Sequence, residues 1–332
     1  MRGLRSRVLP WMALLALSAC ADRGAENGEA AQEAQYGGTV VVVNSSGLRD
    51  LNPLVAAEKF SQEINRYMLY LPLQRHAEDL SYEPALAERW ELLGDTGVVF
   101  HLRRDVRWHD GQPTTARDVV FTYQRAKDPE TAFPNSDYFA QYTGVEARDS
   151  FTVRFSFEPH MDPLAGLAFL PIAPAHLLDS IPSARIAQAA FNTAPVGNGP
   201  FRFVEARQND RWIFEANPDF PEELGGRPYL DRVVLRTIPE PATQQTELFT
   251  GRIDFMTMPP PEMGPQIDAN PTSRVLSYMD RAYVSIMWNQ RREPFGDERV
   301  RRAMTMGFDR EAIVDAVLFG YGVLANSTIP PF

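Results

Sequence analysis

The stretch that decides the fold is FHLRRDVRWHDGQPTTARDVVFTY, residues 100–123. Apolar and polar side chains alternate in its first half, over residues 100–103 and again over residues 106–109. A period of two is typical of half-buried antiparallel strands, so we predict a strand in each segment. The Asp110-Gly111 pair that follows is typical of a turn.

The second half of the stretch predicts a helix. Thr115 to Asp118 is a capping box, in which the first and fourth residues bond to each other's backbone amides. An apolar stripe then follows at helical spacing: Ala116, Val119, Val120 and Tyr123. Strands followed directly by a helix indicate a mixed α/β architecture.

The same patterns continue on both sides of this stretch. Residues 37–44 begin with two glycines and contain four consecutive Val, which indicates a buried strand ending at Ser45. Further strands are predicted at 152–157, 201–206, 212–216, 233–238, 253–256 and 283–288, and helices at 60–73, 174–178 and 243–249. Asp297 and Asp309 each predict the start of a further helix, because Asp is a favoured N-cap residue.

The length and the proline distribution indicate two lobes. Roughly 300 residues follow the N-terminal segment, more than one hydrophobic core usually serves. Three consecutive prolines, Pro259 to Pro261, interrupt the pattern, and we place the lobe boundary there.

The N-terminus predicts export and lipid anchoring. Three arginines precede a short apolar run that ends in Leu17-Ser18-Ala19-Cys20. The run is too short to span a bilayer and matches a secretory signal peptide over residues 1–19. Leu-Ser-Ala-Cys resembles the bacterial lipobox, and Cys20 is the only cysteine, so we expect its lipidation; the alternative is an ordinary signal peptide that contains a Cys. Residues 20–36 are then a flexible tether.

The composition excludes several classes of function. A single cysteine excludes an intramolecular disulfide and a Cys-rich zinc site. The formal net charge of −10 argues against nucleic-acid binding. The five histidines are scattered, and the sequence contains no H-E-x-x-H, no G-x-S-x-G elbow and no phosphate loop. We expect no metal, no cofactor and no catalytic residue.

Several motifs together resemble those of the family 5 extracellular solute-binding proteins. They are PALAERWELLGD (84–95), the stretch at 100–123, PVGNGPF (195–201), LFTGRIDFM (248–256) and NQRREPFGDERVRRAMTMGFDREAIV (289–314). The matches run from about residue 37 to the last residue in the family's order. This family comprises the dipeptide-, oligopeptide- and nickel-binding components of ABC importers.

The resemblance implies an α/β fold of the periplasmic-binding-protein class II, with two lobes, a hinge and a ligand held between the lobes. Lobe I is expected at 37–262, with an inserted subdomain at about 75–190, and lobe II from residue 263. Family members are longer, so we expect lobe II to be incomplete at Phe332, through truncation of the sequence. In the family's peptide binders, the Asp that takes the ligand's amino terminus lies in the part expected beyond it.

Ligand-binding residues are predicted on loops that end strands and on aromatic positions. Ser45, Ser46 and Gly47 end the first strand and offer backbone groups to an extended peptide, or form a simple turn. Tyr138 falls where the family's oligopeptide binders carry a cleft Tyr, and a packing role is the alternative. Tyr283 and Trp288 lie on the strand predicted to open lobe II, with the face of Tyr283 favoured for ligand.

Two other motifs are predicted to be structural. Asn198 and Gly199 precede a proline and a strand, so the G-x-G lacks the helix that dinucleotide binding requires. The WHDG segment at residues 108–111 is predicted to be a strand end and a turn, not a metal site.

The predicted function is peptide capture outside the cytoplasmic membrane for an ABC importer. The partners would be a peptide ligand and separate permease and ATPase chains, and the protein is expected to be a monomer without enzyme activity. Within the same fold, a nickel chelate, an oligosaccharide, glutathione or an opine could replace the peptide. An extracellular hydrolase or a chaperone is the alternative from another class.

Overall fold

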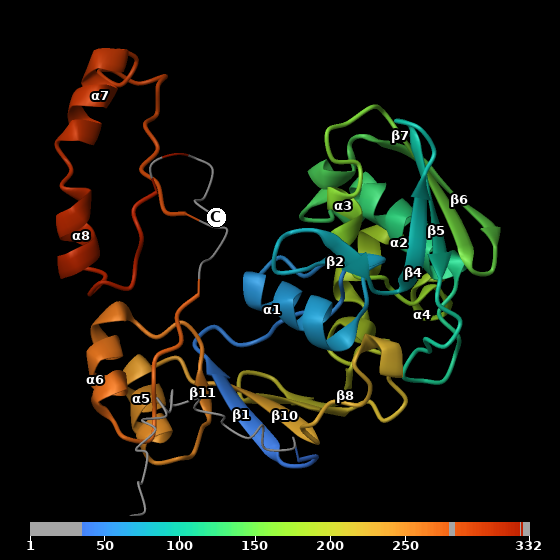
Figure 1. Cartoon of the computed structure of the whole chain (residues 1–332), viewed down its shortest axis with the longest axis horizontal. Helices are drawn as coiled ribbons and strands as arrows, with labels where there is room; N and C mark the ends of the chain where they lie inside the picture. The colour runs from blue at the N-terminus through green and yellow to red at the C-terminus, as the bar shows by residue number, and fades with distance from the viewer. Residues whose placement is uncertain (1–34, 279–282, 326, 328–332) are drawn as a thin grey trace, which may run out of the picture. The chain divides into compact units, whose positions relative to one another are not determined.

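The structure is a computed structural model that describes residues 35–278, 283–325 and 327. The predicted signal peptide, Cys20 and all but the last two residues of the predicted tether lie outside the described residues. Residues 39–256 form a five-stranded sheet, a four-stranded sheet and a two-stranded ribbon with short helices between them, and further helices follow (Figure 1). Within the described ranges, no helix has the length and apolar character needed to cross a membrane.

The first sheet has five strands in the order β11-β1-β10-β9-β8. The strands are β1 (Thr39–Asn44), β8 (Phe201–Arg207), β9 (Arg211–Ala216), β10 (Arg232–Thr237) and β11 (Phe255–Met256). β1 pairs in parallel with β10 and β11, and the other pairs are antiparallel. The carboxyl ends of β1, β10 and β11 therefore lie at one edge of the sheet. These five strands were all predicted from the sequence.

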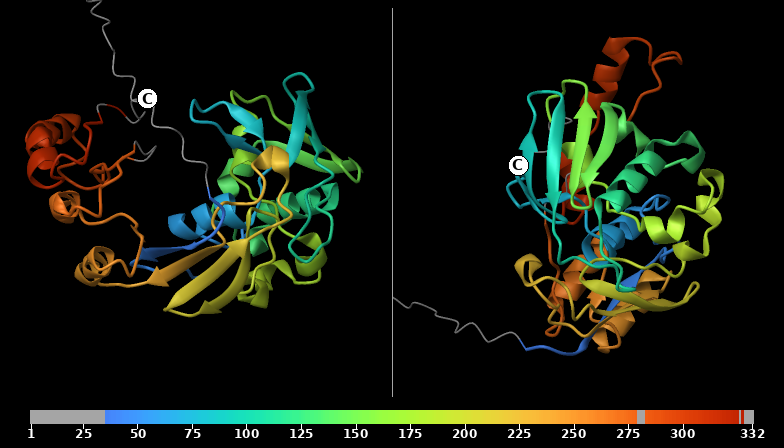
Figure 2. Two further views of the ribbon diagram at one scale, coloured as in Figure 1. Left: turned by 60° about the horizontal axis from the view of Figure 1, so that its bottom comes forward. Right: turned by 90° about the vertical axis from the view of Figure 1, so that its right-hand side faces the viewer.

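The second sheet is antiparallel, with the order β4-β5-β7-β6. It contains β4 (Ala87–Leu92), β5 (Gly97–Leu102), β6 (Tyr142–Asp149) and β7 (Thr152–Phe157). In β7 every second side chain is buried, as the alternating pattern predicts. Helix α2 (Ala116–Lys127) lies on one face of this sheet (Figure 2). A two-stranded ribbon of β2 (Gln74–His76) and β3 (Tyr82–Pro84) precedes it.

The strand predicted at residues 106–109 is wrong. Val106 and Trp108 are buried as the alternation predicts, but the segment folds back on itself. The amide of Trp108 donates to the carbonyl of Gln112 at 2.7 Å, and that of Thr114 donates to Val106 at 3.1 Å. Both edges of β5 are already occupied by β4 and β7, so this segment has no place beside it in the sheet.

The capping box before α2 is confirmed. The carboxylate of Asp118 accepts hydrogen bonds from the Thr115 amide at 2.8 Å and from the Thr115 hydroxyl at 3.3 Å. The other α-helices are short: α1 (Lys59–Ile64), α3 (Ala165–Ala168), α4 (Ala175–Leu178), α5 (Pro241–Phe249) and α6 (Gly264–Ala269). Single 3-10 turns lie at 129–131, 136–139, 183–188, 190–192, 222–224 and 261–263.

The buried apolar side chains of the described residues form two clusters. The larger one contains Trp108, Phe100 and Phe155 as well as Trp212 and Phe214, so it joins residues of both sheets through the segments between them. The smaller one lies around Val43, Ile253 and Ile267, beside the β1 and β11 pair. Burial of these side chains supplies the main driving force for folding.

The last two helices are α7 (Glu298–Met306) and α8 (Arg310–Ala316). Both predicted caps are confirmed, because the carboxylates of Asp297 and Asp309 accept bonds from the first-turn amides of Arg299 and Ala312. Neither helix contains a buried residue, however. The apolar stripes that the sequence predicts to face inward are largely exposed.

The strand predicted at residues 283–288 is also wrong. The segment has no secondary structure, and Val284 and Met287, which would lie on opposite faces of a strand, are both fully or mostly exposed. A strand requires a neighbouring strand for its backbone hydrogen bonds. In the described part of the chain, no strand pairs with this segment.

Candidate functional site

A π-helical turn lies at the centre of the candidate site. Helix α1 continues into a π-helix (Asn65–Leu69), in which the Tyr70 amide donates to the carbonyl of Asn65 at 2.8 Å. Such turns are rare, and they are frequent at functional sites because they redirect the side chains of a helix. Here the turn places Asn65 and Arg66 beside each other at the end of α1. The sequence predicted a plain helix over residues 60–73.

The PVGNGP segment holds this turn in place. The amides of Asn198 and Gly199 donate to the carbonyl of Leu69 at 2.9 and 2.8 Å, and the Asn198 side chain accepts from the Leu71 amide. A Cβ on Gly197 would lie 1.9 Å from the Leu69 oxygen, so only glycine fits there. Asn198 and Gly199 are therefore structural, as the sequence predicts.

The side chain of His109 contacts the same PVGNGP segment. Its Nδ1 accepts from the Gly197 amide at 3.2 Å, and its Nε2 lies 3.0 Å from the Gly199 carbonyl oxygen. Both contacts are satisfied by the neutral ring with the proton on Nε2. Burial lowers the pKa of His109 to about 4. The WHDG segment thus has the structural role predicted, and the described residues contain no group of three or more side chains able to hold a metal ion.

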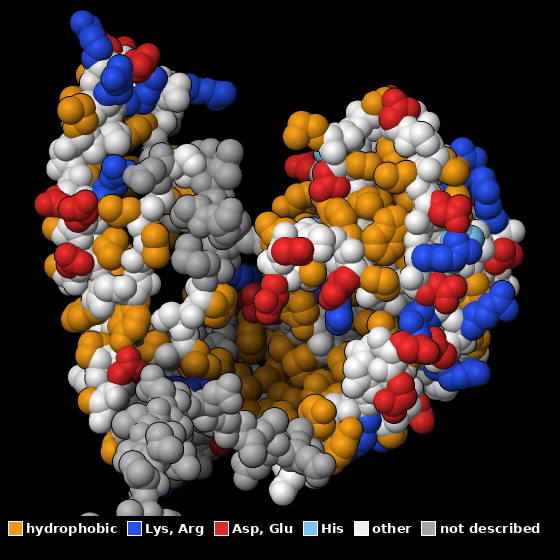
Figure 3. Space-filling view, in the orientation of Figure 1, with side chains coloured by type: hydrophobic (Ala, Val, Ile, Leu, Met, Phe, Trp, Pro, Cys, Tyr) orange, Lys and Arg blue, Asp and Glu red, His pale blue; other side chains and the backbone are white. Residues whose placement is uncertain are grey.

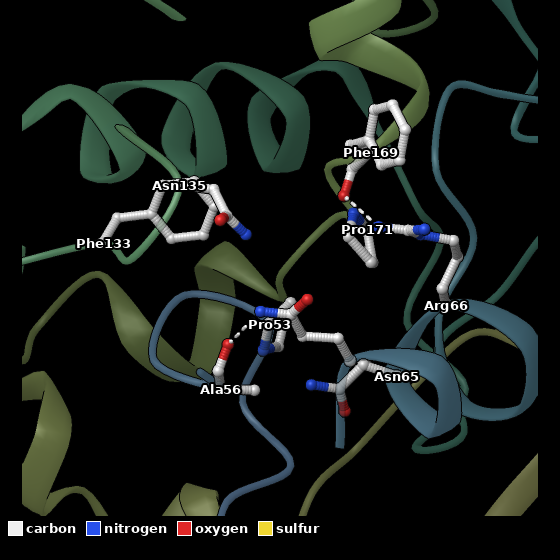
Figure 4. Close-up of a pocket in the computed structure, with 9 residues that line it drawn as sticks. Pro53, Ala56, Asn65, Arg66, Phe133, Asn135, Phe169 and Pro171 are labelled. Atoms are coloured by element: carbon white, nitrogen blue, oxygen red, sulfur yellow. Dashed lines mark hydrogen bonds between the residues drawn. The ribbon is translucent and has the colours of Figure 1, made fainter. Parts of the chain in front are cut away.

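A pocket opens beside the π-helical turn (Figure 4). Phe133 and Asn135 lie on one side of it, Arg66, Phe169 and Pro171 on the other, and Pro53 and Asn65 complete the wall. The space measures about 280 Å³ including its solvent-open mouth.

Asn65 has unused hydrogen-bonding capacity in this wall. The residue is 1% exposed, yet its side-chain Nδ2 and Oδ1 have no hydrogen-bond partner among the described residues. Buried amide groups are nearly always bonded, because an unsatisfied one costs about 1–3 kcal/mol. Asn65 can therefore donate to and accept from a molecule that enters the pocket.

Arg66 also has unused capacity. Its guanidinium lies over the ring of Phe169, 4.7 Å from the centroid, and Nη2 donates to the Phe169 carbonyl at 3.3 Å. Its Nε is buried without a partner, and no carboxylate of the described chain lies within ion-pair distance. A positive charge held against an aromatic ring is available to an anionic or polar ligand.

Tyr138 lies next to this pocket. Its ring stacks on that of Phe169, with centroids 5.7 Å apart and planes at 11°, and it is 52% exposed. Figure 3 shows hydrophobic side chains gathered on the face that carries α1 and α3. Tyr138, Phe169 and Arg66 thus form one continuous surface, which we call the Arg66–Tyr138 surface.

The loop after β1 is largely satisfied by its own hydrogen bonds. The Asn44 side chain accepts from the Ser46 amide at 2.9 Å, from the Ser46 hydroxyl at 2.8 Å and from the Gly47 amide at 3.2 Å. Gln244 donates to the hydroxyl of Ser45 at 3.0 Å. Ser45 and Ser46 are exposed, whereas Gly47 is buried with φ +72°. The loop is a closed turn at the carboxyl edge of the first sheet.

The remaining predicted residues lie apart from this surface. Tyr283 is exposed, and Trp288 stacks on Phe295 with centroids 5.3 Å apart. No contact recorded in the described part of the chain joins these two residues, the β1 loop and Tyr138 into one site. Cys20 lies outside the described residues.

Sequence reasoning missed Asn65, Arg66 and Phe169. An Arg and an Asn within a helical pattern are ordinarily solvated, and only the π-helical turn brings them into a pocket wall. A cue existed in the rigid glycine-rich PVGNGP segment, but nothing in the sequence indicates that it contacts Leu69.

This fold and site define a solute-binding protein of the periplasmic-binding-protein class II. The chain belongs to the bacterial extracellular solute-binding proteins of family 5, because the model of the family's middle region matches residues 81–332.

Individual relatives agree with this assignment. The chain is 33% identical over 319 residues to the oligopeptide-binding protein AppA of Bacillus subtilis, covering 93% of this chain and 57% of AppA. The structure of that AppA in complex with a nonapeptide matches with a TM-score of 0.80 at 31% identity, covering 90% of this chain and 59% of that one. NikZ of Campylobacter jejuni, solved in complex with Ni(L-His), matches with a TM-score of 0.76 at 26% identity, covering 87% and 57%.

The heme-binding protein A of Haemophilus influenzae is 28% identical over 346 residues, covering 96% of this chain and 62% of its own length. The chain thus spans about three fifths of the length of the relatives it matches.

Proposed function

We propose that this protein captures peptides outside the cytoplasmic membrane for an ABC importer. The likeness to the peptide-bound AppA structure, at 31% identity and a TM-score of 0.80, is the observation that carries the proposal. The exposed Tyr138 ring and the unpartnered polar groups of the pocket support it, because peptide sites combine apolar surface with a few hydrogen-bonding groups. We further propose lobe I at 37–262 and lobe II from residue 263.

The proposed mechanism is binding without chemistry. Ligand contacts are assigned to the Arg66–Tyr138 surface, the Ser45–Gly47 loop, and Tyr283 and Trp288. Closure of the lobes around the peptide would create the form that the permease and ATPase chains recognise. Lipidation of Cys20 would hold the protein at the membrane, because two or more acyl chains anchor a protein stably.

Thermal unfolding of the mature protein in the presence of defined ligands tests the proposal. A peptide present at 100 times its dissociation constant is expected to stabilise the protein by about 2.7 kcal/mol. The panel contains tetrapeptides, nonapeptides, Ni(L-His), glutathione and an oligosaccharide. Stabilisation by one of the last three and by no peptide would contradict peptide capture. Cleavage of a bound peptide would contradict a function without catalysis.

A further inference from the structure

We propose that the pocket beside the π-helical turn is a carboxylate subsite, in which Arg66 supplies the positive charge and Asn65 the neutral hydrogen bonds. As a ligand subsite it rests on the function proposed above, and it specifies one chemical group of the ligand. The occupant is a carboxylate group with an adjoining amide, either part of the captured peptide or a free small carboxylate.

The charge environment of Arg66 is the first observation that favours a carboxylate ligand. Arg103 and Arg236 are also partly buried, and both have acidic partners: Arg103 pairs with Asp105 and Glu223, and Arg236 pairs with Glu247. Arg125, which pairs with no carboxylate, donates instead to the Ser183 hydroxyl and to two backbone carbonyls. Arg66 pairs with no carboxylate of the described residues, and its recorded contacts are with the rings of Phe169 and Tyr67 and with the Phe169 carbonyl. A partly desolvated cation without a counter-ion is unfavourable, so a site of this kind favours an anion.

The hydrogen-bonding groups of Asn65 are the second observation, and they favour a carboxylate with an adjoining amide. Its Nδ2 can donate to a carboxylate oxygen, and its Oδ1 can accept from a neighbouring amide N–H of the same ligand. Both atoms lack partners at 1% exposure, so binding would satisfy groups that are otherwise buried and unbonded. A halide ion has no N–H to donate to Asn65 Oδ1, whereas a carboxylate with an adjoining amide satisfies both side-chain atoms of Asn65.

The size and the lining residues of the pocket are the third observation that favours a carboxylate. The pocket measures about 280 Å³ including its solvent-open mouth, which is enough for a carboxylate and its adjoining amide. Among the described residues, no Asp or Glu lines the pocket, so no fixed negative charge from them opposes a carboxylate there. Beyond the mouth, the stacked rings of Phe169 and Tyr138 offer an apolar surface for the rest of the ligand.

A matched pair of small molecules tests the proposal without a known ligand. N-acetylglycine and N-acetylglycinamide share an amide and differ in the carboxylate. They are titrated into the mature protein while the side-chain NMR signals of Arg66 Nε–H and Asn65 Nδ2 are followed. We expect N-acetylglycine to bind about tenfold more tightly, as a charge-assisted hydrogen bond provides. Equal affinities in the wild-type protein would overturn the proposal.

Variants separate this pocket from the rest of the surface. Arg66→Gln is expected to abolish the preference, and Asn65→Ala is expected to weaken the binding of both compounds. Arg117→Gln, which changes an exposed arginine on α2, is expected to retain both the preference and the affinity. Circular dichroism spectra and melting temperatures confirm that each variant is folded. If the preference persists in folded Arg66→Gln, or if a crystal grown with N-acetylglycine shows only a water molecule in the pocket, the proposal is wrong.

Tetra-alanine and its C-terminal amide distinguish the two sources of the carboxylate. Tighter binding of the free acid, lost in Arg66→Gln, assigns the pocket to the carboxylate of the captured peptide. Binding of N-acetylglycine without binding of either tetrapeptide would contradict peptide capture and still support a site for a free carboxylate. The failure of one proposal is thus distinguishable from that of the other.

Discussion

His109 shows how one buried side chain makes the stability of the molecule depend on pH. Its pKa is lowered from 6.5 to about 4 mainly by burial, so the folded protein keeps the ring neutral while the unfolded chain binds a proton below pH 6.5. The unfolded state therefore binds more protons between pH 4 and 6.5, and the free energy of unfolding rises with pH in that window. This contribution is fully present above pH 6.5 and is lost as pH falls towards 4.

We expect the titration of His109 to lower the free energy of unfolding by about 3 kcal/mol as the pH falls from 6.5 to 4. Urea unfolding at a series of pH values measures this loss. The His109→Gln variant, which has no titrating ring, is expected to show a shallower dependence over the same window. The exposed His160→Gln serves as the control and should retain the wild-type slope. Identical slopes for His109→Gln and the wild-type protein would contradict the assignment.

Gly197 shows that close backbone approach, and not only a positive φ, can require glycine. An added Cβ would lie 1.9 Å from the Leu69 carbonyl oxygen, which belongs to the backbone and cannot rotate away. We predict that Gly197→Ala lowers the free energy of unfolding by more than about 2 kcal/mol. Gly144→Ala is the matched control, because no atom lies within 4 Å of its Cβ position, and it should change stability by less than about 0.5 kcal/mol. Equal effects in urea unfolding would be inconsistent with this packing.

At the scale of the element, a buried helix cap contributes more to the free energy of unfolding than an exposed one. The carboxylate of Asp118 begins α2 and also accepts from the Ala175 amide at 2.9 Å, so it joins α2 to the start of α4. The carboxylate of Asp297 begins α7 at the surface and bonds only to Arg299.

We predict that Asp118→Ala lowers the free energy of unfolding by about 3 kcal/mol, because it leaves the buried amide of Ala175 and the half-buried amide of Thr115 unsatisfied. Asp297→Ala should cost at most about 1 kcal/mol, as an exposed cap does. Chemical denaturation of both variants gives the comparison. A cost for Asp297→Ala equal to that for Asp118→Ala would show that α7 is packed more tightly than the structure indicates.

The two wrong strands have one physical cause. The alternating patterns at 106–109 and 283–288 describe side chains, whereas a strand also requires a free neighbour for its backbone bonds. The first segment has no open edge beside β5, and the second pairs with no strand of the described chain.

At the scale of the whole molecule, stability is unevenly distributed. The second sheet and α2 surround a dense aromatic core, while α7 and α8 bury no residue. We predict that the amides of α7 and α8 exchange with solvent at close to unprotected rates, whereas those of β5, β7 and α2 exchange only through global unfolding. Hydrogen exchange followed by mass spectrometry measures both. Strong protection of α7 in the isolated protein would contradict this distribution.

The sequence by itself determined most of the elements, the capping box of α2, the N-caps of α7 and α8, the glycine-rich structural turn and the family, because side-chain periodicity and local hydrogen bonding are encoded within a few residues. It also pointed to Tyr138. Only the tertiary structure decided that Asn65 and Arg66 lie in a pocket wall, since their positions depend on a π-helical turn held by Asn198 and Gly199, about 130 residues away in the chain. A contact over that separation has no local signature, because the two segments come together only in the folded chain.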